Sequence, residues 1–197
     1  MKQKQVTELL LQSLQHEKGG IKVYETAIRC AINEDLNEEW QKYLEETQEH
    51  VRILTEACEA LDIDPNASSP GCKVVEHVGT ALVEAMEMAL AEGDANAAQL
   101  VACECVVLAE TKDHADWELL TKCADKATGA QRKVLQAAVD EVEDEEDEHL
   151  YHTKGWCREL WLESLGLKAV LPPPEEEKDV KTAIGAARAE KASARAR

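Results

Sequence analysis

Phenylalanine is missing altogether from this chain of 197 residues, and aromatic residues of all kinds make up only 4% of it. Segments in which β-branched residues alternate with polar ones are almost absent too, which argues against a protein built of β-strands. Alanine, leucine and glutamate dominate instead, and all three are strong helix formers. The composition therefore predicts an all-helical protein.

Long apolar runs are also missing, because none approaches the roughly 20 residues that a membrane span needs. The chain begins Met1-Lys2-Gln3-Lys4 and no apolar signal core follows. We therefore expect a cytoplasmic protein without a membrane partner.

Basic side chains are few, at 22 against 40 acidic ones, so the formal charge is −18. Such a charge disfavours nucleic acid as a partner and attracts cations, including metal ions.

A disulfide framework is not expected, although the chain has seven cysteines. Most of them lie within helical patterns, where a free thiol packs as a small apolar side chain. Their odd number and the expected cytoplasmic setting favour reduced thiols. Phosphate-binding glycine loops, zinc-ribbon spacings and arrangements typical of a Ser–His triad are absent as well.

Apolar residues that recur every three or four positions predict four long helices and one shorter helix. The long helices are predicted at Gln3–Ile32, Glu38–Leu61, Ala95–Lys126 and Ala130–Leu165, and the shorter one at Val74–Ala91. Asp62–Lys73, with two prolines and a glycine, reads as a loop. Two antiparallel hairpins joined by a long crossover containing a short helix form a recognised type of four-helix bundle.

The helical pattern ends at Gly166, so we predict a bundle domain at 1–167 and a flexible tail at 168–197. The tail has three consecutive prolines from Pro172, then an acidic run, then a basic end with few large apolar residues. One interpretation is that it docks on an acidic partner. The apolar face of the short helix Val74–Ala91 also needs cover, which a homodimer would provide.

A weak internal repeat relates the second and fourth long helices. The segment Glu45–His50 matches Asp144–His149 after a shift of 99 residues, and the same shift brings Cys58 onto Cys157. In each copy a carboxylate and a histidine lie one helical turn apart and share a face. Two hairpins derived from one duplicated unit would bring these faces together.

Acidic residues also fall on or beside the inward stripes of the first and third long helices. Glu17 lies between Leu14 and Ile21, whereas Glu104 and Glu110 lie at the edge of their stripe. Buried carboxylates at one level would repel one another unless a cation compensates their charge. Iron(II), manganese(II) and zinc(II) all accept mixed carboxylate and imidazole ligands. The pattern therefore predicts a metal site.

On these residues, Gln3 to Leu165 resembles the ferritin-like superfamily, which includes rubrerythrins, bacterioferritins and manganese catalases. That family takes one Glu from each of two helices and a Glu-x-x-His from each of the other two. The resemblance implies as metal ligands Glu17, Glu46, His50, Glu104, Glu146 and His149, with Glu49, Glu110 and Glu145 as alternatives. Thr47 departs from the family pattern, because it stands three residues before His50 where the family has Glu.

The resemblance further implies two bound ions per chain, with iron expected first and manganese or zinc as alternatives. Oxygen or peroxide would be the reaction partner, in iron handling or in oxidative-stress defence, and any enzyme would be an oxidoreductase of ferroxidase or peroxidase type. Tyr24 is a candidate redox-active neighbour. His77, His114 and His152 are interpreted as structural or surface residues. The alternative is a metal-free helical bundle that serves as a stress or interaction protein.

Overall fold

Helices account for nearly all the regular structure of this protein. The computed structural model describes residues 1–196, apart from the side chains of Glu143 and Ala196. No strand occurs in this part of the chain. Its helices are α1 (Gln3–Cys30), α2 (Glu34–Ala60), α3 (Pro70–Ala91), α4 (Ala95–Lys126), α5 (Gly129–Ser164), α6 (Pro174–Glu177) and α7 (Ala183–Ala196). The prediction of an all-helical protein is confirmed.

Two helices begin earlier than their apolar pattern predicts. α2 starts at Glu34 rather than Glu38, because the side chain of Asn33 accepts the backbone N–H of Leu36 and caps the helix. α3 starts at Pro70 rather than Val74. There Ser69 accepts the backbone N–H of Cys72, and proline is well suited to the first helical turn. Residues that read as loop in the sequence thus form the first turns of both helices.

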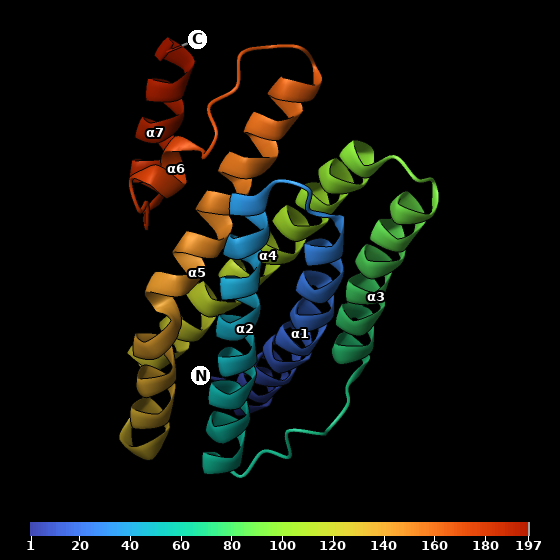
Figure 1. The fold of residues 1–197 in the computed structure, drawn as a ribbon. Coiled ribbons are helices and arrows are strands. Elements are labelled where there is room, and N and C mark those ends of the chain that lie inside the picture. The colour runs from blue at the N-terminus through green and yellow to red at the C-terminus, as the bar shows by residue number, and fades with distance from the viewer. Residues whose placement is uncertain (197) are drawn as a thin grey trace.

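The long helices pack as two consecutive pairs. α1 contacts α2, and α4 contacts α5. The two pairs meet where α1 packs on α4 and where α2 packs on α5. α3 lies outside this group, against α1 and α4 (Figure 1). The connection from α2 to α4 is therefore long and contains a helix of its own.

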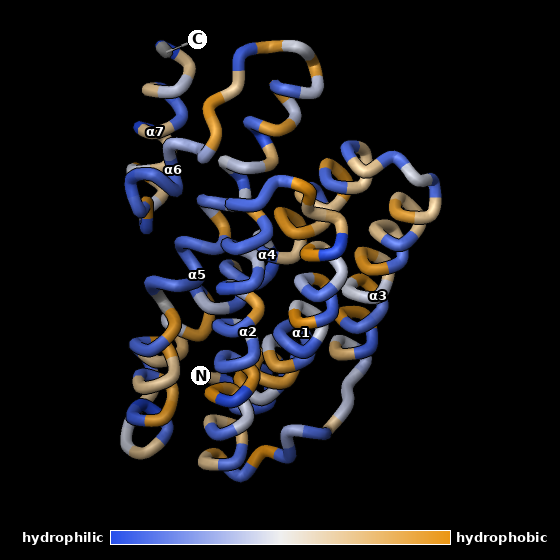
Figure 2. The backbone as a smooth tube through the Cα atoms, viewed as in Figure 1, coloured by the Kyte–Doolittle hydropathy of each residue, from blue (hydrophilic) through white to orange (hydrophobic). Residues whose placement is uncertain are grey.

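The interior consists of two apolar clusters with a polar layer between them. One cluster includes Tyr24, Trp40 and Trp156, and the other includes Leu14, Leu54 and Leu135. Along each of α1, α2, α4 and α5, the residues of one cluster precede those of the other, and polar residues separate them. Hydrophobic positions accordingly line the inside of the helices in both halves of the molecule (Figure 2). The apolar clusters fix the register of the helices around the polar layer.

The segment after Gly166, for which the sequence predicts a flexible tail, contains two helices. It forms α6 and α7, which pack on each other and on α5 (Figure 1). Arg158 on α5 donates two hydrogen bonds to the buried carboxylate of Glu175, at 2.9 and 2.8 Å. This ion pair has no periodic apolar signature, which is why the sequence pattern missed the ordered segment. The domain boundary at 167 and docking on an acidic partner remain predictions.

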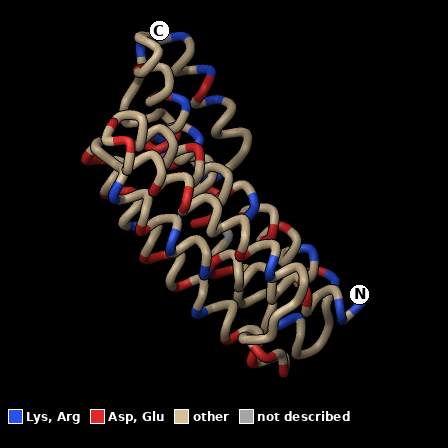
Figure 3. The backbone as a smooth tube through the Cα atoms, turned by 90° about the vertical axis from the view of Figure 1, so that its right-hand side faces the viewer, with Lys and Arg blue, Asp and Glu red and all other residues tan. Residues whose placement is uncertain are grey.

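The distribution of charge follows the sequence. Acidic and basic positions are interspersed along the whole molecule, whose two termini lie at opposite ends (Figure 3). Among residues 1–196, no helix combines the length and apolar character needed to cross a bilayer.

All seven cysteines have free thiols, and burial raises the pKa of Cys58 to about 11. The thiols therefore serve as small packing groups.

Candidate metal centre

Six ionisable side chains occupy the polar layer between the two apolar clusters, and we call them the central cluster. They are Glu17 from α1, His50 from α2, Glu110 and Asp113 from α4, and Glu146 and His149 from α5. Each is between 0 and 5% exposed. Four acids and two imidazoles are thus withdrawn from water at one level of the helices, where burial of an uncompensated charge is costly.

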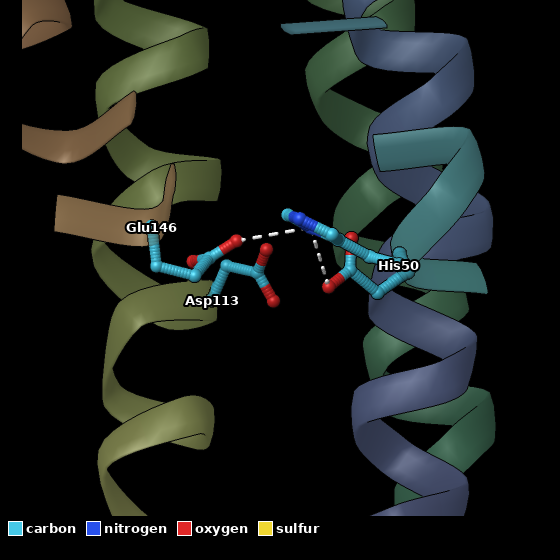
Figure 4. Close-up of side chains that lie close together, drawn as sticks. His50, Asp113 and Glu146 are labelled. Atoms are coloured by element: carbon cyan, nitrogen blue, oxygen red, sulfur yellow. Dashed lines mark ion pairs between the residues drawn. The ribbon is translucent and has the colours of Figure 1, made fainter. Parts of the chain in front are cut away.

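The central cluster contains two overlapping sets of metal donors. The first set is Glu17, His50, Asp113 and Glu146, and the second is Glu110, Glu146 and His149. Within each set, one ligand atom per residue lies within 4.8 Å of the others. Glu146 belongs to both sets. Figure 4 shows Glu146 and Asp113 facing His50 across the interior. A carboxylate shared in this way can bridge two ions.

Carboxylates at the edge of the central cluster orient both histidine rings. Nε2 of His50 lies 2.8 Å from Glu145 Oε2, and Nε2 of His149 lies 2.9 Å from Glu46 Oε2. The other ring nitrogen, Nδ1, points inward in each case. For His50 it lies 3.2 Å from Glu146 Oε1. Outer carboxylates that fix the tautomer and direction of a ligating imidazole are usual around protein metal sites.

Aromatic donors hold two of the carboxylates. The indole N–H of Trp117 donates to Glu17 Oε1 at 2.8 Å, and the hydroxyl of Tyr24 donates to Glu110 Oε1 at 2.8 Å. In each case the second oxygen of the carboxylate receives no hydrogen bond from the residues described. One oxygen of each acid is therefore anchored and the other is available to a ligand.

These contacts obey an approximate two-fold symmetry. A shift of 99 residues takes Glu46 to Glu145 and His50 to His149, and each histidine contacts the glutamate of the other copy. A shift of 93 residues similarly takes Glu17 to Glu110 and Tyr24 to Trp117. Here too each aromatic donor serves the carboxylate of the other copy. The duplication predicted for α2 and α5 thus extends to α1 and α4.

The symmetry fails at two adjoining positions. The same shifts relate Gly20 to Asp113 and Thr47 to Glu146, so one half is small and uncharged where the other is acidic. A Cβ atom at Gly20 would lie 3.2 Å from Cγ2 of Thr47, so α1 and α2 approach closely at this point. The carboxylate that the family pattern expects at Thr47 is therefore absent, and Asp113 adds one on the opposite wall.

Protons compensate part of the buried charge. Burial raises the pKa of Glu146 to about 7, and burial together with the charge of Glu146 raises that of Asp113 well above its usual value. Burial opposes the charge on His149, but Glu110 and Glu46 more than offset it and raise its pKa to about 10. Nearby carboxylates, Glu17 foremost, also raise the pKa of His50 despite its burial. Cations that replaced these protons would be held by the same groups.

Several donor atoms lack a conventional partner. Neither oxygen of Glu146 receives a hydrogen bond from any described residue, and the same holds for Oδ1 of Asp113. Nδ1 of His50 likewise forms no hydrogen bond with a described residue, although two carboxylates face it. Buried polar atoms are nearly always satisfied in native proteins, so this convergent group of exceptions is a place that could hold a metal ion.

The structure distributes the sequence-predicted ligands over three environments. Glu17, His50, Glu146 and His149 belong to the central cluster, as does the alternative Glu110. Glu46 and the alternative Glu145 contact the histidines from outside. Glu104 and the alternative Glu49 are exposed and reach neither donor set. Tyr24 lies beside the cluster as a donor to Glu110.

On α4, Glu110 and not Glu104 lies in the central cluster. The inward stripe of α4 runs through Cys103, Val106, Glu110 and Asp113, and Glu104 points away from it. Sequence reasoning missed Asp113 and the anchoring role of Trp117. Glu110 and Asp113 are three residues apart, as are Glu146 and His149. This shared spacing could have revealed Asp113.

Comparison with known proteins adds no family assignment. No family model, no curated protein and no solved structure matches this chain. The candidate metal centre is thus carried by its own geometry alone.

Proposed function

We propose that this chain is a ferritin-like four-helix bundle whose central cluster binds two divalent metal ions, most readily iron, with manganese or zinc as alternatives. The observation that carries the proposal is the pair of donor sets that share Glu146. The unpartnered donor atoms of Glu146, Asp113 and His50 support it, because they converge on the interior from three different helices.

Charge balance favours two divalent ions. The central cluster has four carboxylic acids, Glu17, Glu110, Asp113 and Glu146, and two imidazoles. With all four acids ionised and both imidazoles neutral, four negative charges match the four positive charges of two such ions. Mixed oxygen and imidazole ligation suits iron, manganese and zinc. The protons now favoured on Glu146, Asp113 and both histidines would leave on binding.

The two metal positions would be unequal. The first has four protein donors, whereas the second has three, so the second leaves more room for a small exogenous ligand. Iron(II) bound at such a position could be oxidised by oxygen or peroxide, which is the chemistry implied by the family resemblance. Tyr24 orients Glu110 at this second position through its 2.8 Å hydrogen bond.

Metal content per chain tests the proposal. The purified chain is incubated anaerobically with Fe(II), desalted and assayed by mass spectrometry, and the assay is repeated with Mn(II) and Zn(II). We expect about two ions per chain. Glu146→Gln should reduce this to less than one, because the shared carboxylate serves both positions. The matched control is Glu104→Gln, which removes the same charge from an exposed site on α4 and should leave the content unchanged.

The outcome also decides between functions. If the wild-type chain retains none of the three metals, the proposal fails and the metal-free helical bundle is favoured. If Glu146→Gln binds as much metal as wild type, the ions lie elsewhere on this acidic protein. Helical content measured by circular dichroism on each variant separates loss of metal from loss of fold.

A further inference from the structure

A small cavity between α4 and α5 leads to the central cluster. Its volume is about 130 Å³, ample for several water molecules at about 10–15 Å³ of such space each. It is lined by His114, Trp117, Glu118 and Thr121 from α4 and by Val139, Glu146 and Asp147 from α5. Glu146, whose two oxygens receive no hydrogen bond within residues 1–196, thus forms part of its wall.

Polar donors surround the outer part of this cavity. Nδ1 of His114 lies 3.4 Å from Asp147 Oδ1, and its Nε2 lies 3.9 Å from Glu118 Oε1. The side chains of His114 and Asp147 are 20% and 24% exposed, whereas that of Glu118 is 66% exposed. Donor groups therefore extend from solvent, through His114 and Asp147, to the buried Glu146.

A second pocket lies beside the central cluster, between α2 and α5. It is lined by two lysines and by six acidic residues, Glu46, Asp140, Glu141, Asp144, Glu145 and Glu148. Lys42 and Lys181 contact Glu148 at 2.8 and 2.5 Å and offset part of this negative charge. Behind them, Glu46 and Glu145 already contact the histidine rings. An ion that arrived this way would have to separate those pairs.

We propose that the α4–α5 cavity is the route by which divalent metal ions reach the central cluster, and that His114 and Asp147 form a transient metal-binding site on that route. This inference rests on the proposed function. One imidazole nitrogen and one carboxylate oxygen, completed by water, suit iron(II), manganese(II) or zinc(II). A site with only two protein ligands binds weakly enough to release its ion to the six groups beyond it.

The rate of metal loading tests the route, since the final content tests the proposed function. The metal-free chain is mixed anaerobically with Fe(II), the reaction is stopped with a chelator at successive times, and the retained iron is measured. His114→Ala and Asp147→Asn should each load more than ten-fold more slowly than wild type. Both should reach the wild-type iron content after long incubation, because the central cluster is intact.

Two further variants separate the route from general attraction by charge. Asp144→Asn removes the same charge as Asp147→Asn, one turn earlier on α5, but from the neighbouring pocket between α2 and α5. It should load at the wild-type rate. Thr121→Phe leaves the charge unchanged and fills part of the cavity. It should slow loading at least as much as Asp147→Asn does.

The possible results are distinguishable. Wild-type rates in His114→Ala, Asp147→Asn and Thr121→Phe would overturn the route while leaving the metal centre in place. Equal slowing by Asp144→Asn and Asp147→Asn would also overturn it, because only net charge would then matter. A wild-type chain that never retains iron, manganese or zinc would remove the proposed function, and this inference with it.

Discussion

Glu145 on α5 fixes the ring of His50 on α2, through a contact of 2.8 Å between Oε2 and Nε2. The hydrogen on Nε2 is thereby favoured, and Nδ1 is left facing Glu146 and Glu17. Glu145 is itself 37% exposed, so it stands between solvent and a fully buried imidazole. Its role in the proposed centre is to position a ligand.

Glu145→Ala should weaken metal binding without abolishing it. Loss of an outer carboxylate typically lowers metal affinity about 10- to 100-fold, because the ligating ring loses its fixed tautomer and direction. Competition against a chromophoric chelator measures the change. The control is Glu141→Ala, at an exposed acid one turn earlier on α5. An unchanged affinity in Glu145→Ala would show that the contact with His50 is dispensable.

The stability of the metal-free protein should depend on the ionisation of Glu146. Burial raises the pKa of its carboxyl from 4.5 to about 7, so the native chain holds a proton that the unfolded chain releases. Native stability therefore falls as the pH rises from 4.5 to about 7. Glu146→Gln cannot ionise, so the free energy of unfolding of this variant relative to wild type should rise by about 3 kcal/mol across this range.

Urea unfolding of both proteins at a series of pH values, with chelator present, measures that difference. The comparison cancels the groups that titrate equally in the two proteins. A constant difference between pH 4 and pH 8 would contradict the expectation. Saturating metal should reverse the ranking, because wild type gains binding free energy that Glu146→Gln cannot gain.

Asp113→Asn should weaken metal binding at one position only. Asp113 belongs only to the four-donor set, so the position formed by Glu110, Glu146 and His149 keeps its donors. The four-donor set loses one charged ligand but keeps Glu17, His50 and Glu146, so we expect a lower affinity there and not the loss of an ion. Competition against a chelator measures the two binding steps, and Asp125→Asn, at an exposed acid near the end of α4, serves as the control. Unchanged affinity in both steps of Asp113→Asn would show that the four-donor set does not need its aspartate.

Arg158→Ala should detach the C-terminal helices. Glu175 is 2% exposed, and removal of its guanidinium partner leaves a buried carboxylate unpaired, which costs about 3–5 kcal/mol. We expect the segment to detach from α5 and not bear this cost. Limited proteolysis between Gly166 and Pro173 should then accelerate more than ten-fold. Lys154→Ala, at an exposed position one turn earlier on α5, should not change the rate.

The helices and much of the central cluster could be predicted because periodicity determines which side of a helix faces inward. Glu17, His50, Glu146 and His149 lie on such inward faces. α4 was harder, because apolar residues almost surround it between Leu100 and Ala109 and blur the stripe that distinguishes Glu104 from Glu110. Asp113 was missed because a shorter acid stands where the family pattern contains none.

Features that depend on single contacts could not be read from periodicity. The first turn of α2 includes the cap at Asn33, and the pair Arg158–Glu175 joins α6 to α5. His114 was interpreted as structural or surface because nothing in the sequence indicates its contact with Asp147. The residues that make such contacts are not separated by any regular number of positions along the chain.

The exchanged pairs His50–Glu145 and His149–Glu46 have the form of a contact between two identical subunits. In a symmetric homodimer every substitution occurs in both subunits, so a glycine in one subunit requires a glycine at the same position of the other. A chain that contains both halves is free of that constraint. It can keep Gly20 where the helices crowd together and place Asp113 at the equivalent position. The presence of two similar hairpins in one chain thus allows the two proposed metal positions to differ in ligand number, within a framework that remains nearly symmetric.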